Sequence, residues 1–336
     1  MKETLIKTPN TFGDWAYLAI KKHFKKTIKH ESDVLKDKEP EALHQMRVGM
    51  RRLRTAIAGF SPAISLPKAA KEQKIAKIAR QLGELRDIDV LQEALENKYI
   101  PALPTWVVLQ EQDALKKVLS TLAHQREKSL QQVQTTLQAE QYQKLKRAFK
   151  DYLEKPKYGE LAEISIYEIL PDLLLPSVSK LFLDPAWLVG VKLKNGEIYI
   201  KEHLDSEAVA ELLDIEGDRL HSLRKQAKRV RYQMELFTDF YSSNYQDYLQ
   251  DVKDIQSILG EIQDSFVLGQ FLTDTLGSDL TVQLPTLAAE LTQTRSQAWQ
   301  KWQSLQQRYL DTKTRKDFHK VLLKPVATPK QPIEED

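Results

Sequence analysis

The sequence predicts an all-α protein with two pseudo-symmetric helical bundles that arise from an internal duplication, together with a small β-hairpin insertion. Glycine makes up only 11 of the 336 residues, or about 3% against roughly 7% in average usage, which disfavours turn-rich sheets and glycine loops for nucleotides. Long stretches carry apolar residues at helical spacing. Two blocks of sequence also recur at one fixed offset, and this recurrence predicts the duplication.

Helices are expected throughout the N-terminal half. Pro40 separates the first two helices, and Asn97–Pro104, which contains two prolines, is predicted to be a connection. The helices are expected at 11–33, 41–60, 67–95, 106–139 and 141–153. Together they make up a predicted N-terminal helical repeat at 11–153.

The chain breaks near its middle, at Lys155–Gly159, and helices are expected to resume after this break. The expected helices are 164–183, 217–241, 245–276 and 284–323. They make up a C-terminal helical repeat at 160–323, so that the two repeats form one domain over 11–323. Residues 324–336 contain three prolines and three acidic residues, which predicts a disordered tail.

Residues 187–200 differ from the rest of the chain because apolar and polar residues alternate there with period two. The alternation surrounds Asn195-Gly196, and an Asn-Gly pair between two such runs is a strong signal for a β-hairpin. We therefore expect a two-stranded insertion at 187–200. A β-barrel is disfavoured because no further strand pattern follows.

Two blocks carry the internal repeat. His44–Phe60 reappears as His221–Phe237, and Leu82–Leu91 reappears as Leu259–Leu268. The offset is 177 residues in both cases, and 11 of the 27 aligned positions are identical. A shared offset is typical of a duplicated structural unit, and such units normally stack on one another to bury a common core.

Each copy of the first block places basic residues on one face of a helix. In the first copy these residues fall within about 80° of one another around the helix axis, opposite an apolar side. We call them the first basic row: His44, Arg47, Arg51 and Arg54. The matching residues of the second copy form the second basic row: His221, Arg224, Lys228 and Arg231.

Neither row is interspersed with acidic residues that would balance its charge. Four arginines and no carboxylate lie between Ala42 and Phe60, and six lysines and arginines and no carboxylate lie from Arg219 to Met234. A solvated helix face usually intersperses Glu with Lys four residues apart, which relieves repulsion by about 0.2–0.5 kcal/mol per pair. The pattern favours a bound polyanion with repeating phosphates, because arginine forks match phosphate oxygens. Ion pairs with carboxylates of other helices and a merely solvated face remain alternatives.

Composition excludes several classes of site. The chain has no cysteine, so disulfides, cysteine-ligated zinc and thiol nucleophiles are excluded. Its 50 lysines and arginines and 47 acidic residues leave a net charge of +3, which is too small to indicate a partner. The most apolar run, 164–178, is interrupted by charges and prolines, and the N-terminus lacks a secretory pattern, so we expect a cytoplasmic protein without a membrane span. Phosphate-binding-loop, hydrolase and metalloprotease motifs are missing, and we expect no enzyme, cofactor or metal.

Both blocks resemble the CHAD family, the conserved histidine α-helical domain. The resemblance rests on the two basic rows and on the Leu82–Leu91 block with its Arg86-Asp87 pair, and it spans about 11–323. It implies two helical bundles that enclose a basic cavity and bind inorganic polyphosphate. The implied role is a targeting, storage-associated or regulatory module, with an association with polyphosphate granules.

By this resemblance the two basic rows line the anion site. Three neighbouring residues are flanking candidates: Arg52, Lys225 and Arg229. Asp87 and Asp264 are expected to orient a basic residue of the neighbouring helix by ion pairing, and direct magnesium binding alongside phosphate is the weaker alternative. Five further basic residues are additional candidates, although such residues are more often plain surface charge: Lys22, Lys25, Lys29, Lys77 and Arg80. The second copy departs from the first where Gln263 replaces Arg86 and Phe266 replaces Asp89.

His44 and His221 are expected to donate hydrogen bonds to phosphate oxygens. Neither has a second histidine or a carboxylate three or four residues later, so a helical metal pair is not expected. A hydrogen-bonded histidine inside a bundle is the structural alternative.

Three other function classes stay open, and the third of them is a helical adaptor that binds an acidic protein through the polar helix at 106–139. A nucleic-acid-binding helical module is disfavoured because Tyr232 is the only aromatic residue inside either motif before its terminal phenylalanine, which leaves little for bases to stack on. An accessory enzyme of polyphosphate or triphosphate metabolism is the second alternative. The sequence indicates neither a chain-length preference nor an oligomeric state.

Overall fold

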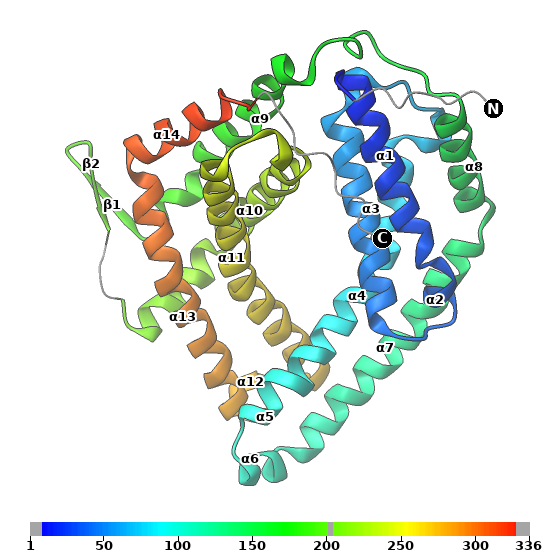
Figure 1. The fold of residues 1–336 in the computed structure, drawn as a ribbon. Helices are drawn as coiled ribbons and strands as arrows, with labels where there is room; N and C mark the ends of the chain where they lie inside the picture. The colour runs from blue at the N-terminus through cyan, green and yellow to red at the C-terminus, as the bar shows by residue number, and fades with distance from the viewer. Residues whose placement is uncertain (1–8, 201–203, 327–336) are drawn as a thin grey trace. The chain divides into compact units, whose positions relative to one another are not determined.

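The computed structural model describes residues 9–200 and 204–326, and it is helical with one two-stranded sheet (Figure 1). This architecture confirms the all-α fold class with a β-hairpin, whereas the internal duplication stays a prediction. Across the described ranges, no helix is both long and apolar enough to cross a membrane.

The chain divides into two compact units. The first unit consists mainly of residues up to 89 and of 126–173, and the second mainly of 90–125 and 174–325. The units are defined by contacts in space, whereas the repeats are defined by sequence. The division into units therefore does not test the repeats at 11–153 and 160–323, which stay a prediction. Three helices contribute to both units: α4 (Glu72–Ala94), α7 (Gln112–Gln138) and α9 (Ile166–Phe182).

The first unit is built around α1 (Phe12–Lys29) and α3 (Pro40–Gly59), together with α2 (Glu31–Leu35), α8 (Glu140–Glu154) and parts of α4 and α7. Its core holds the apolar sides of these helices, and the rings of Phe24 and Phe149 stack there with centroids 5.1 Å apart. A capping box fixes the start of α1, because Oγ1 of Thr11 accepts from the N–H of Asp14 while the Asp14 carboxylate accepts from the N–H of Thr11, each at 3.1 Å.

Gly49 lets α1 and α3 approach each other closely. A Cβ on Gly49 would lie 2.9 Å from the backbone nitrogen of Thr27, closer than side-chain carbons normally come. The hydroxyl of Thr27 donates a hydrogen bond to the carbonyl oxygen of His23 at 2.8 Å, so this donor is satisfied where the two helices meet. This close approach packs α1 directly against α3.

The second unit holds α10 (Ser206–Leu236), α11 (Ser243–Leu276) and α13 (Pro285–Leu310) as its longest helices. Its core is aromatic, with the rings of Trp187 and Trp302 5.1 Å apart and the ring of Tyr309 5.7 Å from that of Trp187. The shorter helices of this unit are α5 (Ile100–Ala102), α6 (Thr105–Gln110), α12 (Leu280–Gln283) and α14 (Thr312–Leu322).

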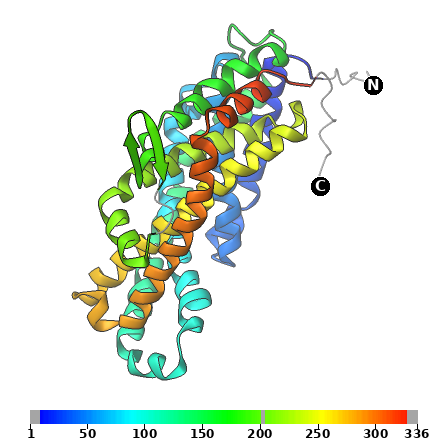
Figure 2. The ribbon, with the colours of Figure 1, turned by 90° about the vertical axis from the view of Figure 1, so that its left-hand side faces the viewer.

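The hairpin consists of β1 (Val191–Lys194) and β2 (Glu197–Ile200), which pair antiparallel (Figure 2). Asn195 and Gly196 form its turn with φ values of 54° and 81°, the left-handed backbone that an Asn-Gly pair adopts readily. The strands begin four residues after the predicted start at 187. Trp187 instead belongs to a 3-10 turn, where its ring is buried and its indole N–H donates to the carbonyl oxygen of Leu181 at 2.8 Å.

Several helix boundaries differ from the prediction because side chains cap helices at positions that periodicity does not reveal. The predicted 284–323 helix is divided near Asp311, whose carboxylate accepts from the N–H groups of Lys313 and Thr314 and starts α14. Helix α10 begins eleven residues before the predicted start at Gly217, where Asp205 caps the N–H of Ala208 at 2.8 Å. The predicted connection at 97–104 is largely helical, with a π-helical turn at 95–99 followed by α5. Most of the predicted tail at 324–336 lies outside the described residues.

Candidate functional site

Helix α3 holds the first basic row on the side opposite its buried residues. Met46, Met50 and Leu53 are at most 1% exposed and face the core of the first unit. The four residues of the row are each partly exposed. Burial of one side of α3 therefore fixes the direction in which the row points.

Arg47 is the most firmly held member of the first basic row. Its Nη1 donates to the carbonyl oxygens of Leu82 and Gly83 on α4, at 3.2 Å for Leu82, and approaches Oδ1 of Asp87 at 3.5 Å. A Cβ on Gly83 would lie only 3.2 Å from this nitrogen, so the glycine makes room for the guanidinium. The side chain of Arg47 is 18% exposed and that of Asp87 76%, which places the carboxylate at the outer edge of the contact.

The second unit repeats this arrangement at positions 177 residues later. Nη2 of Arg224 lies 3.6 Å from Oδ1 of Asp264, and a Cβ on Gly260 would lie 3.3 Å from Nε of Arg224. Asp87 and Asp264, which the sequence analysis expects to orient a basic residue, thus lie beside equivalent arginines. The two recurring blocks therefore contact each other within each unit, which gives a physical reason for their joint recurrence.

Carboxylates from outside the row segments also reach the rows. Nε of Arg54 donates to Oε1 of Glu72 on α4 at 2.7 Å, and Nη2 of Arg54 lies 2.6 Å from the same oxygen. Arg231 pairs instead with Glu235, one turn later on α10, with Nε 2.8 Å from Oε1. Arg54 and Arg231 therefore form ion pairs with carboxylates, which was one of the alternatives from the sequence. Other members of the rows lie close to like charges.

Positive charge is nevertheless concentrated around His44. Burial is the largest cause that lowers the pKa of His44; Glu41 opposes this effect, and Arg86 and Arg51 lower the pKa further. The pKa of Arg47 is also lowered, first by burial and then by Arg51 and Arg86, against the opposing charge of Asp87. The cations of this group therefore repel one another, and an anion between them would relieve the repulsion.

His221 occupies a similar environment in the second basic row. Burial lowers its pKa first, followed by the charges of Lys225 and Arg224. Within the described part of the chain, Nδ1 of His221 is buried without a hydrogen-bond partner. Lys225 and Arg229, the flanking candidates on α10, are exposed beside it.

Arg86 belongs to the charged group around His44, although it is not among the candidate residues from the sequence. It lies on α4 one turn after Gly83, the residue that packs against Arg47, so α4 carries it towards the first basic row. The one-turn spacing between Gly83 and Arg86 is the sequence signal that could have identified Arg86 as a site residue. Gln263 takes this position in the second copy, and the two groups of charges are therefore not equivalent.

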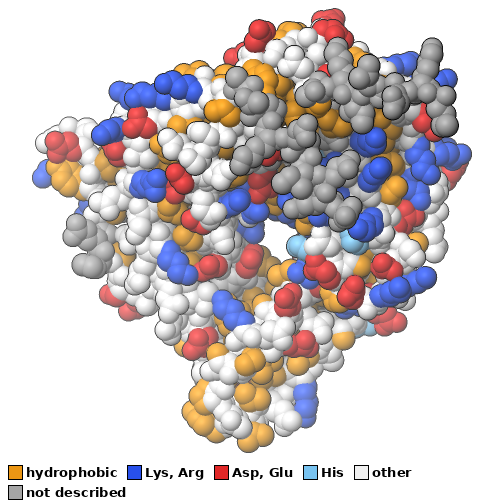
Figure 3. Space-filling model, in the orientation of Figure 1, with side chains coloured by type: hydrophobic (Ala, Val, Ile, Leu, Met, Phe, Trp, Pro, Cys, Tyr) orange, Lys and Arg blue, Asp and Glu red, His pale blue; other side chains and the backbone are white. Residues whose placement is uncertain are grey.

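A second cluster of cations joins Arg52 to α1. The pKa of Lys26 is lowered by burial first and then by Arg52, Lys22 and Lys29. The neighbouring His23 is 7% exposed, and burial followed by the charges of Arg52, Lys22 and Lys26 lowers its pKa to about 4. Lysine or arginine side chains gather on the face shown in Figure 3, in the region where Figure 1 draws α1 and α3. Lys26 is not among the five additional candidates, although it belongs to the same run of lysines before the first block.

The remaining candidates are spread over the surface of the first unit. Lys22, Lys25 and Lys29 lie on α1, and Lys77 and Arg80 lie on α4, all five of them exposed. Lys22 and Lys29 thus act on the pKa of Lys26, as Arg52 does, whereas Lys77 and Arg80 lie on a separate stretch of the first unit, on α4. Within the described residues, no group of three or more histidine or acidic side chains could hold a metal ion.

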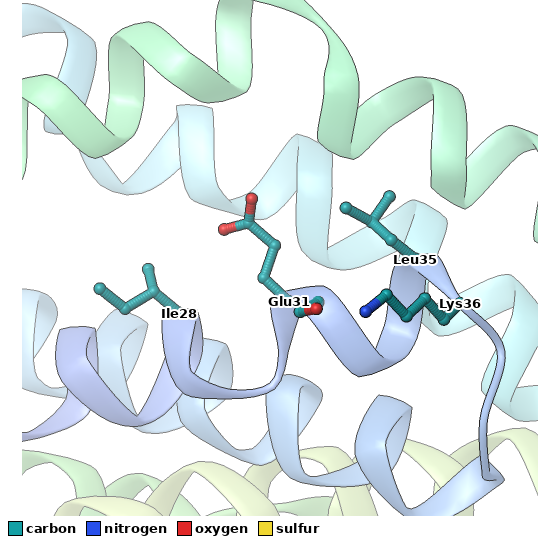
Figure 4. A pocket seen from close by; sticks show the side chains of 5 residues that line it. Ile28, Glu31, Leu35 and Lys36 are labelled. Carbon is teal, nitrogen blue, oxygen red and sulfur yellow. The ribbon is translucent and has the colours of Figure 1, made fainter.

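A hollow of about 320 Å³ lies in the first unit beside α2 (Figure 4). It is lined by Ile28, Glu31, Ser32, Leu35 and Lys36. The carboxylate of Glu31 is already paired, because Nζ of Lys146 lies 2.8 Å from Oε1 and the Tyr142 hydroxyl donates to Oε2 at 3.0 Å. The hollow contains no residue of either basic row.

Comparisons with known proteins agree with this architecture. The family model of the CHAD domain matches residues 18–273. The crystal structure of the CHAD domain from the plant Ricinus communis is 19% identical and superposes with a TM-score of 0.57, with 98% of this chain and 97% of that chain covered. PptA from Streptomyces chartreusis is 12% identical, with a TM-score of 0.62 and coverage of 89% of this chain and 100% of that chain. No curated protein matches the chain. At these identities the solved structures show a shared fold.

Proposed function

Because the chain belongs to the CHAD domain family, we propose that it binds inorganic polyphosphate through the basic rows of α3 and α10. Binding is electrostatic and involves no turnover, so the protein acts as a targeting, storage-associated or regulatory module for polyphosphate in the cytoplasm. The observation that carries the proposal is the crowding of like charges around His44, where Arg51 and Arg86 lower the pKa of both His44 and Arg47.

The spacing of each row suits a linear anion. Positions 44 to 54 extend over about 15 Å of helix axis, at roughly 1.5 Å per residue. A single phosphate contacts one or two members of such a row, whereas a chain of phosphates can contact all four. Arginine forks also hold phosphate oxygens without reading bases, which favours polyphosphate over a nucleic acid.

Arg47 is held in one position before the ligand arrives. The carbonyl oxygens of α4 and the space left by Gly83 hold the guanidinium of Arg47 in one position, so less side-chain freedom is lost on binding. The partner carboxylates of Asp87 and Asp264 are largely exposed and their contacts are long, at 3.5 and 3.6 Å. Phosphate oxygens can therefore compete with them for the same cations.

The test is a titration of the full chain with polyphosphate after charge reversal in both rows. We expect Arg51→Glu combined with Lys228→Glu to lower the affinity by more than 10-fold while the helix content stays unchanged in circular dichroism. Lys116→Glu combined with Lys117→Glu, at exposed positions of α7, makes the same change in net charge and serves as the control. Full affinity in the doubly reversed row variant would show that the rows are not the site.

Competition and turnover separate the other function classes. Added at equal phosphate concentration, polyphosphate should displace bound RNA or DNA, and a failure to do so favours a nucleic-acid-binding module. Phosphate release with and without magnesium should be absent, and sustained release would establish an enzyme instead.

A further inference from the structure

Three of the lysines of α1 form a stripe along one side of the helix. Lys22, Lys26 and Lys29 fall within about 60° of one another around the helix axis. Lys26 borders the side of α1 that packs on α3, where Thr27 meets Gly49, whereas Lys22 and Lys29 flank Lys26 and are exposed. Arg52 lies one turn after Gly49 on α3, so this contact brings it beside Lys26, the middle lysine of the stripe, on whose pKa it acts.

The stripe is short of balancing charge. Glu41 is the one carboxylate that acts on the pKa of Lys26, and its effect is smaller than those of Arg52, Lys22 and Lys29. Lys22, Lys26 and Lys29 form no ion pair among the described residues. Three lysines and an arginine therefore repel one another along two packed helices, and burial of His23 keeps a further potential cation neutral beside them.

The second unit lacks this stripe. Gln226, which lies 177 residues after Gly49, donates from Nε2 to the carbonyl oxygen of Ser177 at 3.3 Å, so α9 contacts α10 where α1 contacts α3. Helix α1 contains five lysines and one acidic residue, whereas α9 contains a single lysine and two acidic residues. Arg229, the residue equivalent to Arg52, therefore gains no row of lysines from its neighbouring helix.

We propose that Lys22, Lys26 and Lys29 of α1, together with Arg52 of α3, form a second phosphate-binding row in the first unit, which we call the α1 row. It has no counterpart on α9 and α10, so the first unit binds polyphosphate through two rows and the second unit through one. This inference rests on the proposed function and assigns unequal shares of binding to the two units.

The experiment measures how the polyphosphate affinity of the full chain depends on salt, with one defined chain length. The test variant is Lys22→Gln combined with Lys26→Gln, and the control is Lys116→Gln combined with Lys117→Gln, which removes the same charge from exposed positions of α7. Arg51→Gln is measured alongside as a variant of the first basic row. Circular dichroism establishes that each variant keeps its helix content.

We expect the Lys22→Gln and Lys26→Gln variant to reduce the slope of log K against log salt by about 1.4, at about 0.7 per lost phosphate contact. This reduction corresponds to about a 25-fold loss of affinity at 0.1 M salt if the affinities converge at 1 M. The control should keep the slope of the unchanged protein.

Two results would overturn the inference, and they differ in what they say of the proposed function. If the α1 variant behaves like its control while Arg51→Gln still weakens binding, the α1 row does not bind phosphate and the proposed function stands. If the unchanged protein does not bind polyphosphate at all, the proposed function fails and the α1 row fails with it.

Discussion

Replacing Gly83 with alanine should stabilise α4 and at the same time displace the guanidinium of Arg47. Gly83 lies inside α4, where alanine is more favourable than glycine by roughly 0.5–1 kcal/mol. The added Cβ would stand 3.2 Å from Nη1 of Arg47, so the guanidinium must give way by a few tenths of an ångström. The end of an arginine side chain moves at little cost. The gain in the helix therefore exceeds the strain, and the free energy of unfolding should rise.

Polyphosphate affinity should change in the opposite direction. The displaced Nη1 moves away from the carbonyl oxygens of Leu82 and Gly83, which hold Arg47 in the geometry of the first basic row. A hydrogen bond between this guanidinium and a phosphate oxygen contributes about 1.5–3 kcal/mol, and a guanidinium displaced by a few tenths of an ångström loses a part of that contribution. We expect a loss of about 0.7–1.4 kcal/mol in binding, which is a roughly 3- to 10-fold lower affinity.

Urea unfolding and polyphosphate titration of the same preparations measure the two effects. Gly217→Ala is the matched control, because Gly217 also lies inside a helix and a Cβ there meets nothing within 4 Å. It should gain stability without any change in affinity. Equal affinities for Gly83→Ala and Gly217→Ala would refute the claim that α4 positions Arg47 for binding.

Three further predictions concern titration and buried charge. Burial and nearby cations lower the pKa of His44 and of His221, so both are less protonated in the free protein than ordinary histidines, and a bound polyanion should restore their protons. Affinity should then increase as the pH falls from 8 to 6, and replacing both residues with glutamine should remove this increase; an unchanged pH profile would count against their contact with phosphate. The pKa of His23 falls from 6.5 to about 4 on folding, so the unfolded chain binds the proton more readily and stability is lost as the pH falls from 6.5 towards 4. Urea unfolding should show a loss of up to about 3 kcal/mol over that range, which His23→Leu should abolish. Arg126→Met should lower the free energy of unfolding by about 3 kcal/mol, because it leaves the carboxylate of Asp89, 4% exposed and 2.9 Å from Nε of the arginine, without its partner; a loss below about 1 kcal/mol would contradict this.

The sequence predicts best those features that depend on local pattern. Asn195-Gly196 specified the hairpin turn because few other residue pairs adopt its left-handed backbone. The apolar side of α3 specified which way the first basic row faces. The common offset of the two blocks also anticipates that they belong together, and the contact of Arg47 with Gly83 shows why they do.

Tertiary contacts decide what the sequence leaves open. Glu72 reaches Arg54 because α4 packs beside α3, and no spacing along the chain indicates that ion pair. Arg86 joins the group around His44 for the same reason. Trp187 continues the alternating pattern of the hairpin, yet burial of its indole in an aromatic core removes it from the strand.

The salt dependence of polyphosphate binding to the unchanged protein tests the central claim most directly. Each row contains three permanently charged residues, and at about 0.7 counterions per contact a single row predicts about a 20-fold fall in affinity between 50 and 200 mM salt. Six such contacts from both rows predict a fall of about 300-fold. A fall of at least 20-fold is the result that the account predicts. Binding that changes by less than about 3-fold, or that is absent, would contradict it.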